Sequence, residues 1–402
     1  MKVAIITTGY LPVPASKGGA VESIVDNIIK ENEIFNKMQL EIFSCFDKDA
    51  YDKSNKLKYT KIDFIKIPKL IKLVDKIIKF IATKILNKKN IVAYSYIAQR
   101  LYFLNNVSKK LKKYNYDKII LENHASLFLA LKWRKNYKKY SEKYYYHIHN
   151  EMKSFYGCEE IIKKCKKILC VSEYIKIHVE KKLKSKNAFV LTNCIDTDKF
   201  NGILEKEEKA LLKKKYKIGK NDIVLLFTGR LNKEKGIEEL LKAISEIKLA
   251  NFKLLIVGSF FFGINMKGKF EKKISELIHD VKDKVIFTGY VPYDEIQKIY
   301  AMADIATLPS IWEDPAPLTI IESMASGLPI ITTNSGGIPE YAQNGCAIIL
   351  KKEEDLIEKL KESIEILIKD KQRRNEMSEI SKENAKILNL NNFYNNLLAF
   401  LK

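Results

Sequence analysis

Residues 304–333, DIATLPSIWEDPAPLTIIESMASGLPIITT, predict a strand, a loop, a helix and a second strand in succession. The first strand ends at Pro309, and a loop continues to Pro317. Pro317 favours the start of a helix over residues 318–326, because a proline has no backbone N–H to leave unbonded in the first turn. An apolar run at residues 329–333 completes the unit. Such strand–helix–strand units build parallel sheets that helices cover on both faces.

The same alternation extends through the chain and predicts an α/β fold with two doubly wound, Rossmann-like domains. Residues 201–222 are polar and rich in Lys and Glu, so we place the domain boundary there. The predicted domains are residues 1–200 and 201–388, and residues 389–402 form a helix long enough to pack back on the N-terminal domain. The cleft between two such domains is the natural ligand site. Further apolar runs lie at residues 2–8, 39–46, 116–122, 143–149, 166–172, 188–193, 223–228, 252–257, 284–288 and 346–350.

Composition excludes several classes of protein. The chain of 402 residues is 46% hydrophobic and 30% charged, which is typical of globular domains and not of disordered chains. No apolar run reaches the roughly 20 residues that cross a bilayer, and residues 1–10 favour a first strand over a signal peptide. The six cysteines form no Cys-x-x-Cys pair, which favours small buried thiols over metal ligands. We therefore expect a cytoplasmic protein in a reducing compartment.

The helix predicted at residues 318–326 has chemistry at its N-terminus. The backbone N–H groups of Leu318 and Thr319 would point out of the helix start, where an anion is favoured. Glu322 lies one turn further in, and its carboxylate could accept two hydrogen bonds from a vicinal diol such as a ribose. Asp314, in the preceding loop, could hold a sugar hydroxyl.

This stretch resembles the E-x7-E signature of the family 4 retaining glycosyltransferases, which have the GT-B fold. The chain departs from the family pattern at Asp314, where the first acid is usually Glu, and at Cys194, where a glycine is usual. The loop PVPASKGGA at residues 12–20 is similar to that of bacterial members that build surface polysaccharides. Other segments similar to the family's occur in the family's order over nearly the whole chain: KGGAVE at 17–22, LTNCIDTDKF at 191–200, TGRLNKEKG at 228–236, FTGYVP at 287–292 and NSGGIPE at 334–340.

Arg230 and Lys235 follow the predicted strand at residues 223–228, at the edge of the sheet where ligands bind in such folds. Two fixed cations there suit a diphosphate, which is the leaving group when a nucleotide sugar reacts. The resemblance implies this role for both side chains and places Gly229 beside them. The alternative is a pair of solvated charges in a lysine-rich protein.

A glycine pair, Gly18 and Gly19, lies between the first predicted strand and a helix that we expect from residue 20. Glycines there let the backbone approach a phosphate or a sugar closely, and a simple turn is the alternative. The resemblance implies that this loop closes on the donor and faces the acceptor. Tyr290 and Val291 fall where the family holds the nucleotide base with main-chain atoms.

Two of the five histidines, His147 and His149, lie two residues apart, and alternation along a strand places both on one face. The resemblance implies that His149 lines the sugar pocket. The alternative is a hydrogen-bonded structural histidine, which is what we expect of His147. The candidate catalytic residues are His149, Arg230, Lys235, Asp314 and Glu322. The candidate donor-binding residues are Gly18, Gly19, Gly229, Arg230, Lys235, Tyr290, Val291, Leu318, Thr319 and Glu322.

We expect neither a metal nor another cofactor. Two Asp-x-Asp strings occur, at residues 47–49 and 196–198, and such pairs bind divalent metals in glycosyltransferases of the other common fold. The second string belongs to the family segment at 191–200, and the first is typical of a polar turn.

The net charge of +22 is concentrated in residues 51–150, which hold 24 Lys and Arg against 6 Asp and Glu, a net +18. Residues 68–90, PKLIKLVDKIIKFIATKILNKKN, predict a basic amphipathic helix. Such a helix can lie on an anionic membrane, where each basic residue contributes about 1 kcal/mol. Alternatively, its apolar side packs in the domain core and its lysines face water.

The expected function is retaining transfer of a hexose from a nucleotide diphosphate sugar, most simply a UDP-sugar, to a saccharide or lipid-linked saccharide acceptor. The resemblance places this reaction in the synthesis of surface polysaccharide or lipopolysaccharide, at the inner face of the cytoplasmic membrane if the basic helix binds lipid. One alternative is another enzyme of the same fold, such as a nucleotide-sugar epimerase or hydrolase. A basic nucleic-acid-binding protein is disfavoured, because no nucleic-acid motif accompanies the charge.

Overall fold

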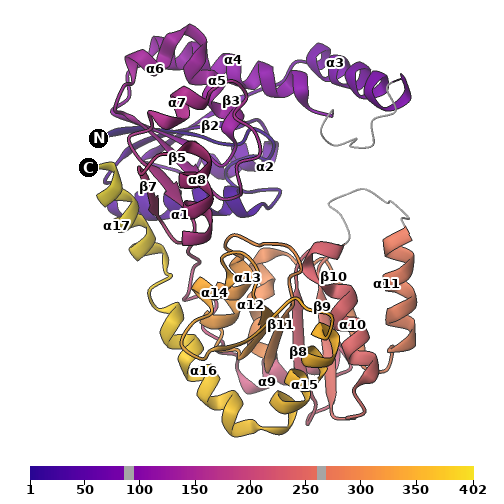
Figure 1. Ribbon diagram of the computed structural model, residues 1–402. Coiled ribbons are helices and arrows are strands. Elements are labelled where there is room, and N and C mark those ends of the chain that lie inside the picture. Colours follow the sequence, from indigo (N-terminus) through magenta and orange to yellow (C-terminus); the bar gives the residue numbers. More distant parts are fainter. Residues whose placement is uncertain (86–94, 260–268) are drawn as a thin grey trace. The chain divides into compact units, whose positions relative to one another are not determined.

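The structure is a computed structural model that describes residues 1–85, 95–259 and 269–402 (Figure 1). The chain folds into two compact units. The N-terminal unit comprises Met1–Thr192 together with Phe393–Lys402, and the C-terminal unit comprises Asn193–Asn392.

The boundary between the units falls between Thr192 and Asn193, whereas the sequence placed it after residue 200. Residues 193–200 belong to the C-terminal unit because Ile195 and Phe200 are buried in its core. A polar stretch marks a change in surface composition, but the apolar side chains decide which core a segment joins.

Within the described residues of the N-terminal unit, seven parallel strands form a sheet in the order β3-β2-β1-β4-β5-β6-β7. The strands are β1 (Lys2–Ile6), β2 (Gln39–Cys45), β3 (Thr60–Ile65), β4 (Lys118–Glu122), β5 (Tyr144–Ile148), β6 (Ile168–Cys170) and β7 (Ala188–Val190). Strand order reverses between β1 and β4. The carboxyl ends of these two strands therefore form a topological switch point, where ligands bind in open parallel sheets.

Helical segments connect these strands (Figure 1). They are α1 (Ala20–Phe35), α2 (Lys48–Ser54), α3 (Lys69–Phe80), the π-helical turn η1 (Ile81–Ile85), α4 (Ile97–Lys113), η3 (Ala125–Leu127), α5 (Phe128–Lys132), η4 (Trp133–Lys135), α6 (Asn136–Lys139), α7 (Glu159–Lys163) and α8 (Glu173–Leu183). Residues 86–90 of the predicted basic helix lie outside the described residues.

The described residues of the C-terminal unit contain a six-stranded parallel sheet in the order β10-β9-β8-β11-β12-β13, whose switch point lies between β8 and β11. The strands are β8 (Ile223–Thr228), β9 (Phe252–Val257), β10 (Val285–Gly289), β11 (Ile305–Leu308), β12 (Ile330–Thr333) and β13 (Ala347–Leu350). The helical segments are α9 (Lys206–Lys215), η5 (Lys233–Lys235), α10 (Ile237–Glu246), α11 (Lys269–Asp280), α12 (Tyr293–Met302), α13 (Leu318–Ala325), α14 (Ile338–Tyr341), α15 (Leu356–Lys369) and α16 (Lys371–Ala385).

Strand β8 shows why these sequences form a sheet that is covered on both faces. Val224 and Leu226 are buried in one hydrophobic cluster, and Leu225 and Phe227 are buried in another. Successive side chains point to opposite faces of a strand, so the sheet separates two apolar cores. The predicted doubly wound α/β architecture is therefore confirmed.

Strand β3 is not among the predicted strands, because Lys61 and Asp63 interrupt its apolar residues. It lies at the edge of the N-terminal sheet, where alternating polar and apolar residues are tolerated. Sequence-based recognition of parallel strands by continuous apolar runs therefore fails at this edge.

The last helix, α17 (Leu390–Leu401), contributes most of its length to the N-terminal unit. Its Leu397 and Leu401 are buried. The hydroxyl group of Tyr394 donates a hydrogen bond to Oδ1 of Asn32 in α1, at 2.8 Å. These contacts attach the end of the chain to the unit in which the chain begins.

Within the described residues, no helix combines the length and the apolar character needed to cross a bilayer. None of the six cysteines forms a disulfide, and all except Cys45 are buried. Burial raises the pKa of the Cys165 thiol well above its usual value, so this group stays protonated. The prediction of small buried thiols is confirmed for most of the cysteines.

Candidate functional site

The switch point of the C-terminal sheet brings two predicted loops together. One loop follows β8 and carries Gly229, Arg230 and η5, and the other follows β11 and carries Asp314. Strands β8 and β11 are neighbours, but the chain leaves them toward opposite sides of the sheet. A small pocket at this point is lined by Phe227, Thr228, Lys235, Leu308, Ser310, Asp314, Pro317, Thr319, Ile320 and Ile338.

Glycine allows the two loops to approach each other. Gly236 has a φ angle of 70°, and a Cβ atom there would lie 1.8 Å from the carbonyl oxygen of Pro309. Neither the conformation nor the space admits a side chain. Gly236 therefore sets how closely the loop carrying Lys235 approaches the end of β11.

Lys235 and Asp314 form an ion pair across the switch point. Asp314 is buried. Its carbonyl oxygen accepts a hydrogen bond, at 2.9 Å, from the N–H of Gly337 in the loop after β12, and this bond fixes the backbone of Asp314. The adjacent Glu313 pairs with Lys352 instead. Asp314, and not Glu313, thus lies beside Lys235.

Arg230 lies in the same loop as Lys235 but is arranged differently. Its side chain is 56% exposed, and its guanidinium lies 3.9 Å from the carboxylate of Glu234. Lys235 lines the pocket, whereas Arg230 is not among the lining residues, and within the described part of the chain its ion pair is a long one at the surface. The structure therefore separates the two cations that the sequence placed together.

Helix α13 begins at Leu318, directly after Pro317, and no described side chain caps its first turn. The N–H groups of Leu318 and Thr319 therefore face outward at the positive end of the helix dipole. Thr319 lines the pocket together with Lys235. An anion in this pocket would meet helix amides and an ammonium group at once.

Glu322 is buried one turn into α13. Its carboxylate accepts a hydrogen bond from the hydroxyl of Tyr300 at 2.7 Å and another from Tyr293. Because Tyr300 donates to Glu322, its oxygen accepts the hydrogen bond from Thr228, at 2.8 Å. Burial raises the pKa of Glu322 to about 6, and the two tyrosine hydrogen bonds offset only part of that effect.

Sequence reasoning missed Tyr293 and Tyr300. They lie seven residues apart on α12, which is two helical turns, so both side chains lie on one side of the helix. That spacing was the available signal. Tyr290 and Val291 follow β10, and β9 separates β10 from β8 in the sheet, so their predicted contact with a base remains a prediction.

Gly18, Gly19 and His149 belong to the N-terminal unit and lie near its own switch point. Gly19 has a φ angle of 107°, and a Cβ atom there would lie 2.3 Å from Oε2 of Glu22. Glu22 in turn accepts a hydrogen bond from Thr8, just after β1, at 2.8 Å. The glycine loop is thus packed against the end of β1, and its role toward a donor remains a prediction.

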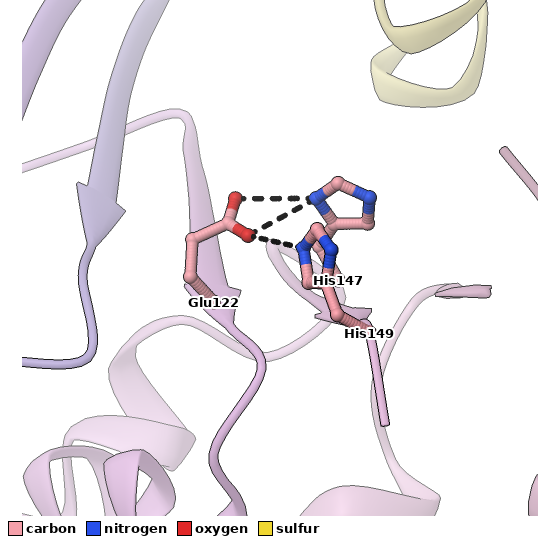
Figure 2. Close-up of side chains that lie close together, drawn as sticks. All are labelled: Glu122, His147 and His149. Carbon is pink, nitrogen blue, oxygen red and sulfur yellow. Dashed lines mark hydrogen bonds and ion pairs between the residues drawn. The ribbon is translucent and has the colours of Figure 1, made fainter. Parts of the chain in front are cut away.

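Three buried side chains meet beside this switch point: Glu122 at the end of β4, His147 on β5, and His149 directly after β5 (Figure 2). Nδ1 of His147 and Nε2 of His149 each lie 3.1 Å from Oε2 of Glu122. Burial raises the pKa of Glu122, but the two histidines outweigh burial and hold it below its ordinary range. Burial, together with the neighbouring His147, lowers the pKa of His149 to about 4. Sequence reasoning found both histidines but not Glu122.

Residues 208–384 match a family model described as Glycosyl transferases group 1. The chain is 27% identical over 358 residues to the putative glycosyltransferase YtcC of Bacillus subtilis (strain 168), covering 86% of this chain and 77% of that protein. It is 23% identical over 350 residues to the lipopolysaccharide 1,2-N-acetylglucosaminetransferase of Salmonella typhimurium (strain LT2), covering 86% of this chain and 83% of that protein.

The solved structures include a similar protein in complex with UDP and glucose, HepE of Anabaena. The two folds agree with a TM-score of 0.73 at 16% identity, covering 100% of this chain and 99% of that chain. At this identity the likeness concerns the fold alone.

Proposed function

Because this chain is a group 1 glycosyltransferase with the GT-B fold, we propose that it transfers a hexose from a UDP-sugar to a saccharide or lipid-linked saccharide, with retention of configuration. The observation that carries the proposal is the Lys235–Asp314 pair beside the uncapped start of α13. Positive charge and free amides converge there at a switch point, which is the arrangement that binds a nucleotide diphosphate.

The diphosphate is the part of the donor that gains negative charge as the sugar leaves. The N–H groups of Leu318 and Thr319 and the ammonium group of Lys235 stabilise that charge. An ammonium group has three donors, so Lys235 can keep its contact with Asp314 while it binds a phosphate oxygen. Arg230, which is exposed in the same loop, can bind the second phosphate.

Two carboxylates hold the neutral parts of the donor. Glu322 accepts hydrogen bonds from the ribose diol, and Asp314 accepts one from a sugar hydroxyl. Tyr300 and Tyr293 keep Glu322 in place without a ligand, so ribose binding exchanges or adds hydrogen bonds at a prepared acceptor. Above pH 6 the carboxylate is mostly ionised and binds hydroxyl donors most strongly.

Retention follows if the acceptor attacks the face of the sugar that the diphosphate leaves. The acceptor oxygen forms a bond to the anomeric carbon, the bond from that carbon to the phosphate oxygen breaks, and this phosphate oxygen takes the acceptor proton. No protein nucleophile is required. We also propose that no metal is required, because Lys235 and the helix amides supply the positive charge; activity unchanged by a chelator is the expected result.

The proposed donor and pathway rest on similar proteins. HepE was solved with UDP and glucose, and the Salmonella relative is a lipopolysaccharide sugar transferase. A bacterial surface glycan, free or lipid-linked, is therefore the proposed acceptor class.

A thermal-shift screen of the full chain against UDP-, GDP- and ADP-sugars tests the proposal. We expect stabilisation by UDP-sugars and loss of at least about tenfold in affinity in Lys235→Ala, because a hydrogen bond to a charged group contributes about 1.5–3 kcal/mol. Lys233→Ala, an exposed lysine of the same turn, is the matched control and should bind as wild type. Equal loss in both variants, or no response to any nucleotide sugar, would refute the donor site.

Product analysis separates transfer from the related reactions. The hydrolase or epimerase alternative predicts turnover of the nucleotide sugar without any acceptor. The transferase predicts negligible turnover until an acceptor is added, and proton NMR of the product should show the anomeric configuration of the donor.

We further propose that α3 attaches the protein to the inner face of an anionic cytoplasmic membrane. The apolar residues of α3 do not all pack in the core. Four of them form an outward row with exposed fractions of 69%, 52%, 51% and 59%: Leu70, Leu73, Ile77 and Phe80. The spacing of three and four residues keeps this row on one side of the helix. Exposed lysines flank it at Lys69, Lys72, Lys76 and Lys79.

The acid of this helix is turned inward. Asp75 is buried and accepts hydrogen bonds from the N–H groups of Ala98 and Gln99, at 2.7 and 3.0 Å, at the start of α4. The outward side of α3 therefore presents apolar and positive groups together. Anionic lipid matches both, with acyl chains for the row and headgroup charge for the lysines. The alternative of an apolar side wholly packed in the core is wrong for these residues.

Sedimentation with vesicles tests the attachment. We expect the protein to bind phosphatidylglycerol vesicles at low salt and not phosphatidylcholine vesicles. The double variant Leu73→Glu/Ile77→Glu should remain in the supernatant, while Leu211→Glu, at an exposed leucine of α9, should sediment as wild type. Failure of the wild type to sediment with anionic vesicles would refute attachment.

A further inference from the structure

The carboxylate of Glu122 accepts from two imidazole rings at the end of β5 (Figure 2). Glu122 and His147 are fully buried, and His149 is 7% exposed, so His149 is the member of the cluster that faces outward. An ionised carboxylate has no proton to give. Each ring nitrogen that faces it must therefore carry a hydrogen atom, which fixes Nδ1–H on His147 and Nε2–H on His149.

The other nitrogen of each ring follows from these two protons. A neutral imidazole has one N–H and one lone pair, so Nε2 of His147 and Nδ1 of His149 are lone-pair acceptors. Nε2 of His147 is buried and has no hydrogen-bond partner among the described residues. A bare lone pair there costs less than a buried, unpaired N–H, which favours the neutral ring for His147.

The backbone of His149 is held as firmly as its ring. Asn123, the residue after Glu122, has a left-handed conformation with a φ angle of 64°. Its N–H donates to the carbonyl oxygen of His147 at 2.7 Å, and its side-chain oxygen accepts from the N–H of His149 at 3.2 Å. Two successive residues of β4 and its loop thus fix the position and the rotation of His149.

We infer that Glu122 is a positioning residue that presents Nδ1 of His149 as a hydrogen-bond acceptor to a hydroxyl group of a bound sugar. The inference rests on the proposed function for the identity of its ligand. The arrangement of protons rests on the geometry of the cluster and on the ionised state of Glu122. Without the carboxylate, nothing in the described cluster would choose between the two neutral forms of His149.

The same three side chains also have the composition of a metal site. Their ligand atoms all lie within 4.8 Å of one another, and two histidines with a carboxylate can bind a transition metal. A histidine bound through Nδ1 carries a hydrogen at Nε2, and metal-bound histidines almost always donate that hydrogen to a partner. Nε2 of His147 has no such partner among the described residues. The cluster therefore favours protons over a metal.

Nitrogen NMR of the wild-type protein, labelled with ¹⁵N at histidine, tests the arrangement directly and needs no variant. We expect neutral rings at neutral pH, with the hydrogen on Nδ1 in His147 and on Nε2 in His149. A hydrogen on Nδ1 of His149 would overturn the inference. So would tight stoichiometric binding of Zn²⁺ that depends on Glu122.

Kinetics test the role toward the hydroxyl. For the wild type, one member of a set of monodeoxy UDP-sugars should react at least about tenfold more slowly, the cost of one lost hydrogen bond to a buried acceptor. Glu122→Gln should be slow with the parent sugar and lose no further rate with that analogue. Glu142→Gln, at an exposed surface acid, is the matched control and should behave as wild type.

If Glu122→Gln loses the same further factor in rate with the monodeoxy sugar as the wild type does, the effect of the variant is merely structural. That result would overturn the positioning role of Glu122. If no nucleotide sugar reacts with the wild type, the proposed function fails, and with it the sugar ligand. The NMR result still decides the proton arrangement in that case.

Discussion

Replacing Glu322 with glutamine tests whether the buried carboxylate serves a ligand at the expense of the fold. Burial raises its pKa from the ordinary 4.5 to about 6. Because of this rise, ionisation of Glu322 at neutral pH destabilises the folded state by about 2 kcal/mol. Glutamine keeps the size of the side chain, and its amide oxygen can accept the hydrogen bond from Tyr300 without carrying charge.

The sign of the pH dependence follows from the direction of the shift. The folded state binds the Glu322 proton more tightly than the unfolded state does. Its contribution to the free energy of unfolding is therefore fully present below pH 4.5 and is lost as the pH rises through about 6. Glu322→Gln has no such loss. We expect the stability of the variant, relative to wild type, to increase by about 2 kcal/mol between pH 4.5 and neutral pH.

Urea unfolding at a series of pH values measures this difference. Calorimetric titration with UDP-sugar at neutral pH should show the opposite trend, with the dissociation constant of the variant raised at least about tenfold by loss of the charged acceptor for the ribose. A variant whose relative stability does not change with pH would refute the burial argument. A variant that binds the donor as wild type would refute the ribose contact.

Three further perturbations test other parts of the account. Gly236→Ala should lower the free energy of unfolding by roughly 1–3 kcal/mol, and by more than the control Gly289→Ala. Both glycines have positive φ angles, but of the two only Gly236 lies against another backbone atom. Equal losses of stability in urea unfolding would contradict the close approach of the two loops. Tyr300→Phe removes a donor from the ionised carboxylate, so carbon NMR should find the pKa of Glu322 above its wild-type value, and an unchanged pKa would contradict the contact. Glu122→Gln should be least stable relative to wild type near neutral pH, because the low folded-state pKa of Glu122 gives stability that is present above its ordinary pKa and lost in acid. A stability difference that stays constant in thermal melts across this pH range would contradict an ionised Glu122 hydrogen-bonded to the two histidines.

The sequence predicted most of the strands, because parallel strands buried on both faces are continuous apolar runs. Val224–Phe227 is such a run, and each of its residues enters one of two cores. Strand β3 was missed because it is an edge strand with charges at alternate positions. The boundary was misplaced because Ile195 and Phe200 join the second core despite the polar stretch after them.

The candidate site was predicted where one short segment contains all its chemistry, and missed where side chains meet only in space. Asp314, Leu318, Thr319 and Glu322 are close in sequence, so a single loop and helix identified them. Glu122 is 25 residues from His147 in the chain, and only the pairing of β4 with β5 brings them together. The ion pair of Lys235 with Asp314 likewise depends on the neighbouring positions of β8 and β11.

The central claim is that the diphosphate of a nucleotide sugar binds at the start of α13, beside Lys235. A crystal structure of the protein with UDP tests it most directly. We predict phosphate oxygens within hydrogen-bonding distance of the N–H groups of Leu318 or Thr319 and of Nζ of Lys235. A diphosphate bound anywhere else, or no bound nucleotide in crystals soaked at millimolar UDP, would contradict it.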